Sequence, residues 1–245
     1  MVPTMMTYIS EEPACLAQIL RDYRQKLAAI EDFARQHPVR RILLLATGSS
    51  LNAALCARYF FEQRFGVLVE IKEPYNFTHY EAVDPHTDLV VAISQSGKSA
   101  STLEAMRKVQ AANLPVFALT SDPQSPIARD CDGVLDINTG IESVGFVTRG
   151  FSATVLNLLL MALMIARVQG RVSEAEEQRY LDELQRLAAA IPDVIARTSR
   201  FIDRHGEALR GGERFIAIGY GALVGVAKEF ETKFTETVRV PSSGF

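Results

Sequence analysis

Short apolar runs alternate with amphipathic segments along most of the chain. Five runs fit buried strands, and each is followed by turn or capping residues and then by polar or helical sequence. These runs cover residues 41–46, 67–72, 89–93, 115–120 and 133–137. Because strands that alternate with helices pack as a parallel sheet covered on both faces, the pattern predicts a doubly wound α/β fold.

Longer helical patterns surround this alternation. Residues 13–37 carry apolar side chains at spacings of three and four, which predicts one long amphipathic helix. An apolar helix is predicted to end near Arg167, and residues 173–205 are predicted to be largely helical with an interruption at Pro192. These helices carry few reactive side chains, so we interpret them as packing or dimerisation surfaces.

The plan of strand, glycine loop and helix returns after Gly211 and Gly212. Residues 214–221 predict a strand and its loop, and residues 222–237 predict a helix. One strand and one helix cannot bury the faces of a sheet. We therefore expect this unit to be incomplete, or to pack on the first sheet domain or on another copy of the chain. The predicted division is an N-terminal helix (1–40), a first sheet domain (41–170), a helical linker (171–210) and the start of a second sheet domain (211–245).

Composition fits a folded, water-soluble protein. Of the 245 residues 48% are hydrophobic and 22% are charged, and the net charge of −3 speaks against nucleic acid as a partner. The apolar segment 153–168 is shorter than a membrane span, and residues 1–11 lack a signal-peptide pattern, so we expect no membrane and a cytoplasmic location. Cys15, Cys56 and Cys131 are widely spaced, so no metal is expected.

Two loops rich in serine and glycine follow the first and third predicted strands. Both fall at the carboxyl edge of the sheet, where parallel α/β proteins bind ligands, and both open into a helix N-terminus that favours a phosphate. An N-capped turn is the alternative explanation. The candidate anion-binding residues are Gly48, Ser49, Ser50, Ser94, Gln95, Ser96, Gly97 and Ser99.

These loops resemble a known family. The segments 46–50, 94–97 and 142–149 are similar to the sugar isomerase (SIS) domain, and the resemblance extends from about Ile42 over nearly the whole chain. It is strongest to the isomerase half of glucosamine-6-phosphate synthase and to fructosamine 6-phosphate deglycases. The resemblance implies a flavodoxin-like three-layer αβα fold, two SIS domains in tandem, a sugar phosphate held by the serine loops, and a homodimer without metal or organic cofactor.

Glu229, Lys233 and Glu236 lie at spacings of four and three, so they share one helical face. Without a functional role, these three residues would form a solvent-exposed helix face with an ion pair between residues four apart. In the family a Glu-x-x-x-Lys-x-x-Glu helix carries the base that moves a proton between C1 and C2 of the open-chain sugar. The resemblance therefore implies Glu236 as base, Lys233 and Glu229 as supporting residues, and Glu229 as the fallback base. Such a base requires burial that raises its pKa toward neutrality.

The resemblance implies several functions. We rank first a deglycase that releases glucose 6-phosphate and an amine from a fructosamine 6-phosphate, since no glutaminase segment precedes residue 41. The alternatives are a synthase-like aminotransferase, an aldose–ketose phosphate isomerase and a non-catalytic sugar-phosphate sensor. The family's His-Gly-Pro element does not occur before Phe245, so we expect a truncated chain that is inactive alone.

Overall fold

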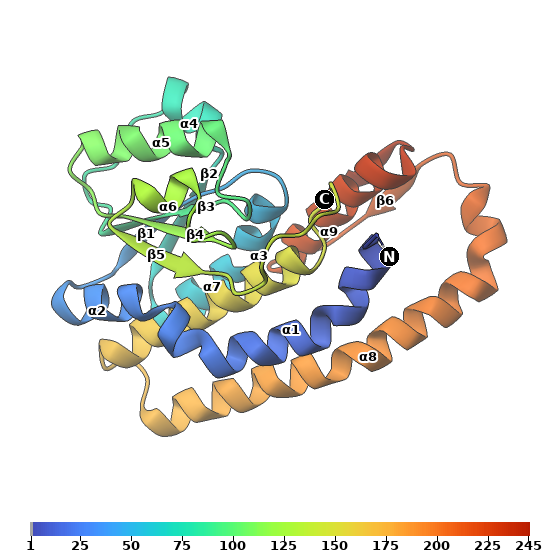
Figure 1. Cartoon of the computed structure of the whole chain (residues 1–245), viewed down its shortest axis with the longest axis horizontal. Helices are drawn as coiled ribbons and strands as arrows, with labels where there is room; N and C mark the ends of the chain where they lie inside the picture. Colours follow the sequence, from blue (N-terminus) through green and yellow to red (C-terminus); the bar gives the residue numbers. More distant parts are fainter. Residues whose placement is uncertain (1) are drawn as a thin grey trace.

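Five parallel strands form the central sheet in the order β2-β1-β3-β4-β5 (Figure 1). The computed structural model describes residues 2–245. The strands are β1 (Arg41–Leu45), β2 (Leu68–Lys72), β3 (Leu89–Ile93), β4 (Val116–Thr120) and β5 (Gly133–Asp136). All five lie at the predicted positions, and their order is that of flavodoxin-like sheets, so the predicted fold class is confirmed.

Side chains along each strand alternate between the two faces of the sheet, as the strand pleat requires. Leu44 and Val91 belong to the larger core on one face, and Leu43 and Val90 to the smaller core on the other. The larger core is covered by α1 (Met5–Lys26), α2 (Ala28–Gln36), α3 (Ser49–Phe65) and α7 (Arg149–Val168), and the smaller by α4 (Pro74–Tyr80), α5 (Ala100–Ala111) and α6 (Pro126–Arg129). Helices therefore lie on both faces, as predicted.

The N-terminal helical region differs from its prediction in two ways. The helix begins at Met5 because the Thr4 hydroxyl caps it, so Pro13 lies inside α1. The chain also leaves the helical conformation at the fully buried Leu27, which separates α1 from α2. The single helix predicted over residues 13–37 is thus wrong in its start and its continuity.

Two proline positions also depart from the pattern. Residues 74–80 form α4, a helix that the sequence pattern did not predict; Pro74 opens its first turn and the Glu73 side chain caps it. α8 (Glu174–Arg210) runs through Pro192, so the predicted interruption is wrong. A proline removes one backbone hydrogen bond, and the turns on either side of Pro192 keep the helical path.

α7 has 20 residues and is apolar enough to cross a bilayer by length and composition. The helix is longer than the predicted apolar segment 153–168, so the prediction that it is too short to span a membrane is wrong. Of its most apolar window, however, 67% is buried inside the protein. α7 packs between the sheet and the N-terminal helices, which is the position of a core helix.

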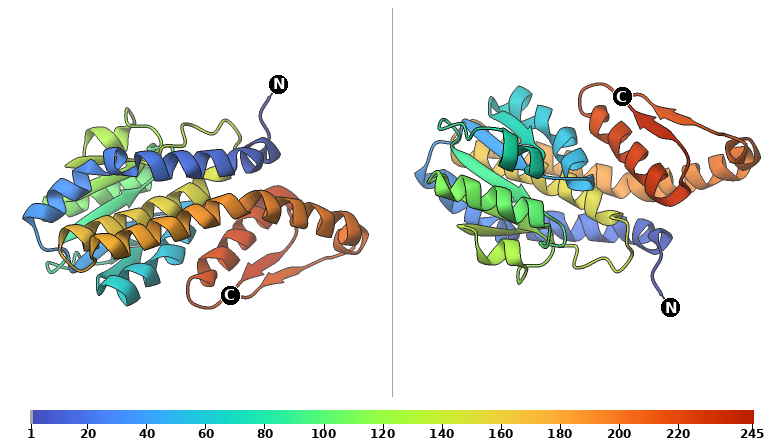
Figure 2. Two further views of the ribbon diagram at one scale, coloured as in Figure 1. Left: turned by 90° about the horizontal axis from the view of Figure 1, so that it is seen from below. Right: turned by 90° about the horizontal axis from the view of Figure 1, so that it is seen from above.

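A second, smaller sheet follows α8, which runs beside α1 and then continues away from the central sheet; after the end of α8 the chain folds back toward α3 (Figure 2). It pairs β6 (Phe215–Ala217) in parallel with β7 (Ser242–Gly244), a strand that the pattern did not predict. α9 (Leu223–Lys233) and the π-helix η1 (Phe234–Val238) connect the two strands. α9 packs on α3 at Gly225, where an added Cβ would lie 2.4 Å from the Asn52 carbonyl oxygen.

Gly225→Ala is expected to lower the free energy of unfolding by about 1–3 kcal/mol, because the added methyl group forces α9 away from the α3 backbone. Gly206→Ala is the matched control, since the nearest atom to its new Cβ is 4.0 Å away on an exposed stretch of α8. That change is expected to stabilise the protein by about 0.5–1 kcal/mol through helix propensity. Urea unfolding measures both, and equal effects would contradict the close packing of α9 on α3.

Candidate functional site

The two serine loops lie side by side because β1 and β3 are neighbours in the sheet. This is the switch point of the strand order, where open parallel sheets bind ligands. The first loop leads directly into α3, whose N-cap Gly48 has φ 57° and ψ −134°. That conformation needs glycine, and it brings the free backbone N–H groups of the first turn of α3 to the sheet edge.

The second loop turns tightly before α5. The Gly97 N–H donates to the Ser94 carbonyl, and Gly97 has φ 65°. An added Cβ there would lie 1.9 Å from Ser125 Oγ, so the loop backbone can follow this path only at a glycine. Ser99 is the N-cap of α5 and accepts hydrogen bonds from the backbone N–H and the hydroxyl of Thr102. The capped-turn interpretation is therefore correct for Ser99, and its own hydroxyl proton can still be donated to a ligand.

A cavity of about 390 Å³ joins the two loops to the end of α9. It brings together most residues of the predicted site. Gly48, Ser49, Ser50, Ser94, Gln95, Ser96, Ser99, Lys233 and Glu236 line it, together with Thr47 and part of the segment 142–148. Gly97 and Glu229 do not line the cavity. Gly97 allows the tight turn of the second serine loop, and Glu229 is buried between α9 and α3.

Glu229 joins α9 to α3 through buried contacts. One carboxylate oxygen accepts a hydrogen bond from Ser49 Oγ at 2.9 Å, and the other accepts one from Asn52 Nδ2 at 2.8 Å. Lys233 Nζ lies 3.6 Å from the first oxygen. Two hydrogen-bond donors and one ammonium group thus surround a single carboxylate. The Ser49 hydroxyl is thus directed at Glu229, so what Ser49 offers an anion in the cavity is its backbone N–H.

Lys233 and Glu236 extend the same helical face to the cavity. Lys233 Nζ lies 2.8 Å from Glu236 Oε2, so one ammonium group contacts both predicted carboxylates. Glu236 lies on the π-helical turn η1, a distortion that is frequent at functional sites. Its side chain is 41% exposed, so the burial expected for a catalytic base is absent in this chain.

Glu142 and Asn52 take part in the site although no role was predicted for them. Glu142 accepts hydrogen bonds from Gln95 Nε2 at 2.9 Å and from the backbone N–H groups of Thr148 and Gly150 at 3.0 and 3.3 Å. It therefore fills the N-terminus of α7 and fixes the Gln95 amide. Glu142 lies outside the N-cap and first turn of α7, so no capping pattern in the sequence marks it. The segment 142–148, which this carboxylate begins, is called the site loop below.

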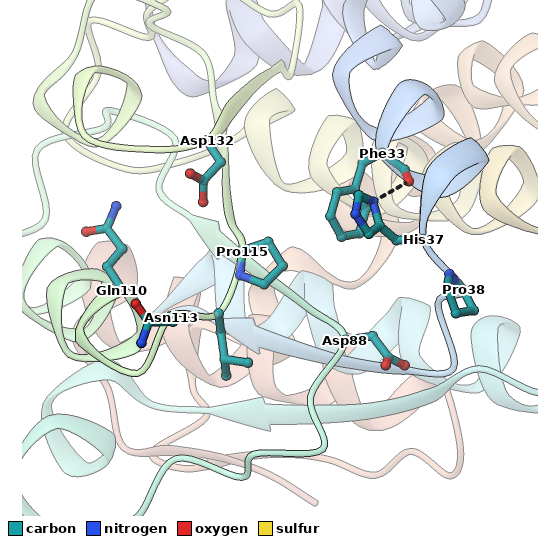
Figure 3. Close-up of a pocket in the computed structure, with 9 residues that line it drawn as sticks. Phe33, His37, Pro38, Asp88, Gln110, Asn113, Pro115 and Asp132 are labelled. Carbon is teal, nitrogen blue, oxygen red and sulfur yellow. Dashed lines mark hydrogen bonds between the residues drawn. The ribbon is translucent and has the colours of Figure 1, made fainter.

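A larger open pocket of about 670 Å³ lies at the opposite, amino edge of the strands (Figure 3). Its carboxylates already serve the backbone: Asp88 accepts from the N–H groups of Arg40 and Arg41, and Asp132 accepts from Val116. This pocket holds no cluster of hydroxyl groups and no long-helix N-terminus. Within residues 2–245, no group of three or more metal-ligating side chains is close enough to hold an ion.

The model of the SIS domain family matches residues 37–167, which is more than half of the chain. The chain belongs to the SIS domain family. It is 31% identical over 243 residues to the isomerising glutamine–fructose-6-phosphate aminotransferase of Symbiobacterium thermophilum, covering 95% of this chain and 39% of that protein. The enzyme of the same name from Zymomonas mobilis is 29% identical over 98% of this chain and 40% of its own length.

A solved structure extends this likeness to the fold of the whole SIS chain. The C-terminal domain of glucosamine-fructose-6-phosphate aminotransferase from Francisella tularensis superposes with a TM-score of 0.90 at 23% identity, covering 98% of this chain and 69% of that one. The predicted resemblance to the isomerase half of these synthases is confirmed. The SIS chain spans about two fifths of the length of the curated relatives it matches.

Glu229→Gln is expected to shift the ionisation of Cys56 to lower pH. Burial, and after it the negative charge of Glu229, together raise the pKa of the Cys56 thiol to about 11. Because a neutral glutamine removes the repulsion of the thiolate, alkylation of Cys56 should begin at lower pH in the variant. Peptide-resolved iodoacetamide labelling across pH 7–11 measures the shift.

Cys131 serves as the internal control for this labelling. Burial raises its pKa too, but Glu229 is not among the causes, so its profile should be the same in both proteins. An unchanged Cys56 profile would show that Glu229 is not a charged neighbour of α3.

Proposed function

We propose that this SIS domain binds a sugar phosphate in the cavity between the serine loops and α9, and that Glu236 transfers a proton between C1 and C2 of the sugar. The observation that carries this proposal is the convergence of two helix N-termini with Lys233 and Glu236 on one cavity. The helix N-termini favour the phosphate dianion, and the carboxylate can exchange a proton. Homology to the isomerase half of a phosphosugar enzyme supports the same ligand class.

The proposed substrate is a fructosamine 6-phosphate, which carries an amine on C1 and a carbonyl group at C2. Glu236 removes a proton from C1, and the electron pair moves toward the C2 oxygen, which takes a proton from solvent. The lone pair of the C1 nitrogen then drives the return of the Glu236 proton to C2, and the nitrogen gives up its own proton to solvent. The product is an imine at C1, which water cleaves to glucose 6-phosphate and the free amine. Lys233, 2.8 Å from Glu236, supplies the positive charge that stabilises the developing oxyanion.

A second candidate is the aminotransferase reaction named in the curated relatives, in which ammonia adds to fructose 6-phosphate. Ammonia first replaces the C2 oxygen as an imine, with loss of water, and the proton then moves from C1 to C2 as in the deglycase reaction. The deglycase reaction stands first because water is the only second reactant it needs. Incubation of the intact protein with a fructosamine 6-phosphate, and separately with fructose 6-phosphate and an ammonium salt, distinguishes the two by their products.

Three further expectations belong to this proposal. We propose that residues 211–245 begin a second SIS domain, because β6, α9 and β7 form a parallel βαβ unit that docks on α3. Homodimerisation and a cytoplasmic location remain predictions. The exposure of Glu236 fits a base that a second domain or a partner subunit covers in the intact protein.

Glu236→Gln is expected to lower turnover of the intact protein by about 10²–10⁴-fold, because the amide cannot accept the proton. Binding of glucose 6-phosphate should stay near the wild-type value, since the serine loops are unchanged. Turnover is followed by glucose 6-phosphate release, and binding by isothermal titration calorimetry.

Glu231→Gln is the matched control on the same helix. Glu231 faces away from the cavity, where it bonds to Lys228 and to the backbone N–H of Gly244. This variant should keep its turnover. Full activity of Glu236→Gln would contradict the assigned base, and binding without turnover in the wild type would favour a sugar-phosphate sensor.

A further inference from the structure

The site loop has no regular secondary structure, so side chains from other elements determine its position. Glu142 fixes one end through Gln95 and α7. The next residue, Ser143, is bonded to Tyr8, which lies 135 residues earlier on α1. Tyr8 Oη accepts a hydrogen bond from the Ser143 backbone N–H at 2.8 Å and shares a second one with Ser143 Oγ at 3.0 Å.

Neighbouring side chains hold Tyr8 itself in place. Its side chain is buried, and the guanidinium group of Arg149 lies 4.8 Å from its ring centroid. Arg149 in turn pairs with Glu11 of α1 and donates to the Thr139 carbonyl at 2.7 Å. The Tyr8 hydroxyl is therefore a preorganised anchor for a loop that would otherwise be free to move.

Besides Glu142, whose carboxylate is bonded to Gln95 and to the start of α7, three residues of the site loop line the cavity: Val144, Gly145 and Val147. These residues carry no charge and no polar side chain, so they suit the carbon skeleton of a ligand and not its phosphate. The phosphate would be held by the serine loops, whose conformation depends on Gly48, Gly97 and the starts of α3 and α5. The two halves of the cavity thus have separate structural supports.

We propose that Tyr8 is a positioning residue that holds the sugar-facing half of the site through Ser143. The proposal rests on the proposed function, namely that the cavity takes a sugar phosphate. It assigns α1 a role in ligand affinity beyond packing against α7 and α8. Its specific consequence is that the Tyr8 hydroxyl affects binding of the sugar without affecting binding of phosphate alone.

Tyr8→Phe keeps the ring over which Arg149 lies and removes only the hydroxyl group. The Ser143 N–H then loses its acceptor, and the site loop spends less time in the binding-competent position. Since apparent affinity falls with that population, glucose 6-phosphate should bind about tenfold more weakly, while inorganic phosphate changes by less than about twofold.

Tyr23→Phe is the matched control. Tyr23 is also a buried tyrosine of α1, and its hydroxyl donates to Glu177 at 3.2 Å, a residue that does not line the cavity. This variant should bind both ligands like the wild type. Isothermal titration of the full 245-residue chain with glucose 6-phosphate and with inorganic phosphate measures all three proteins, and amide hydrogen exchange of residues 142–148 should rise only in Tyr8→Phe.

The outcomes separate this inference from the proposed function. If the wild type binds neither ligand, the proposed function fails. If the wild type binds both and Tyr8→Phe binds glucose 6-phosphate equally well, or weakens both ligands to the same extent, the role of Tyr8 is overturned. An equal loss in Tyr23→Phe would also overturn it, because the effect would then reflect general loosening of α1.

Discussion

The buried carboxylate of Glu229 connects the parts of this molecule that the candidate site needs. It accepts hydrogen bonds from Ser49 and Asn52 of α3 and lies beside Lys233 of its own helix. A buried charge is tolerated only where donors surround it, and removing one partner from such an arrangement costs about 3–5 kcal/mol. The docking of α9 on α3 therefore depends on polar contacts as well as on the close approach at Gly225.

This arrangement also links the anion loop to the proposed chemistry. The helix that Ser49 begins and the helix that carries Glu236 share Glu229 and Lys233 at their contact. A ligand phosphate at the start of α3 would lie near the same ammonium group that contacts Glu236. In the proposed function, binding and proton transfer would therefore use one continuous set of charges, to which both helices contribute.

Much of this could be predicted from sequence because it depends on local patterns. Buried strands appear in the sequence as apolar runs, and the glycines at positions 48 and 97 mark loops with positive φ angles, where at Gly97 a side chain would also collide with Ser125. The break at Leu27 and the continuous helix through Pro192 could not be predicted, since tertiary packing overrides propensity there. The same limit applies to the role of Asn52 and to the bond between Tyr8 and Ser143, which join residues far apart in the chain.

The helices α3, α5 and α7 point their N-termini toward the carboxyl edge of the sheet, and Glu142 occupies the N-terminus of α7. Its carboxylate is bonded to the first backbone N–H groups of α7, where a second anion would otherwise be attracted. The protein thereby supplies its own counter-anion at that position. A second anionic group of a ligand at this position would have to compete with a tethered carboxylate for the same donors.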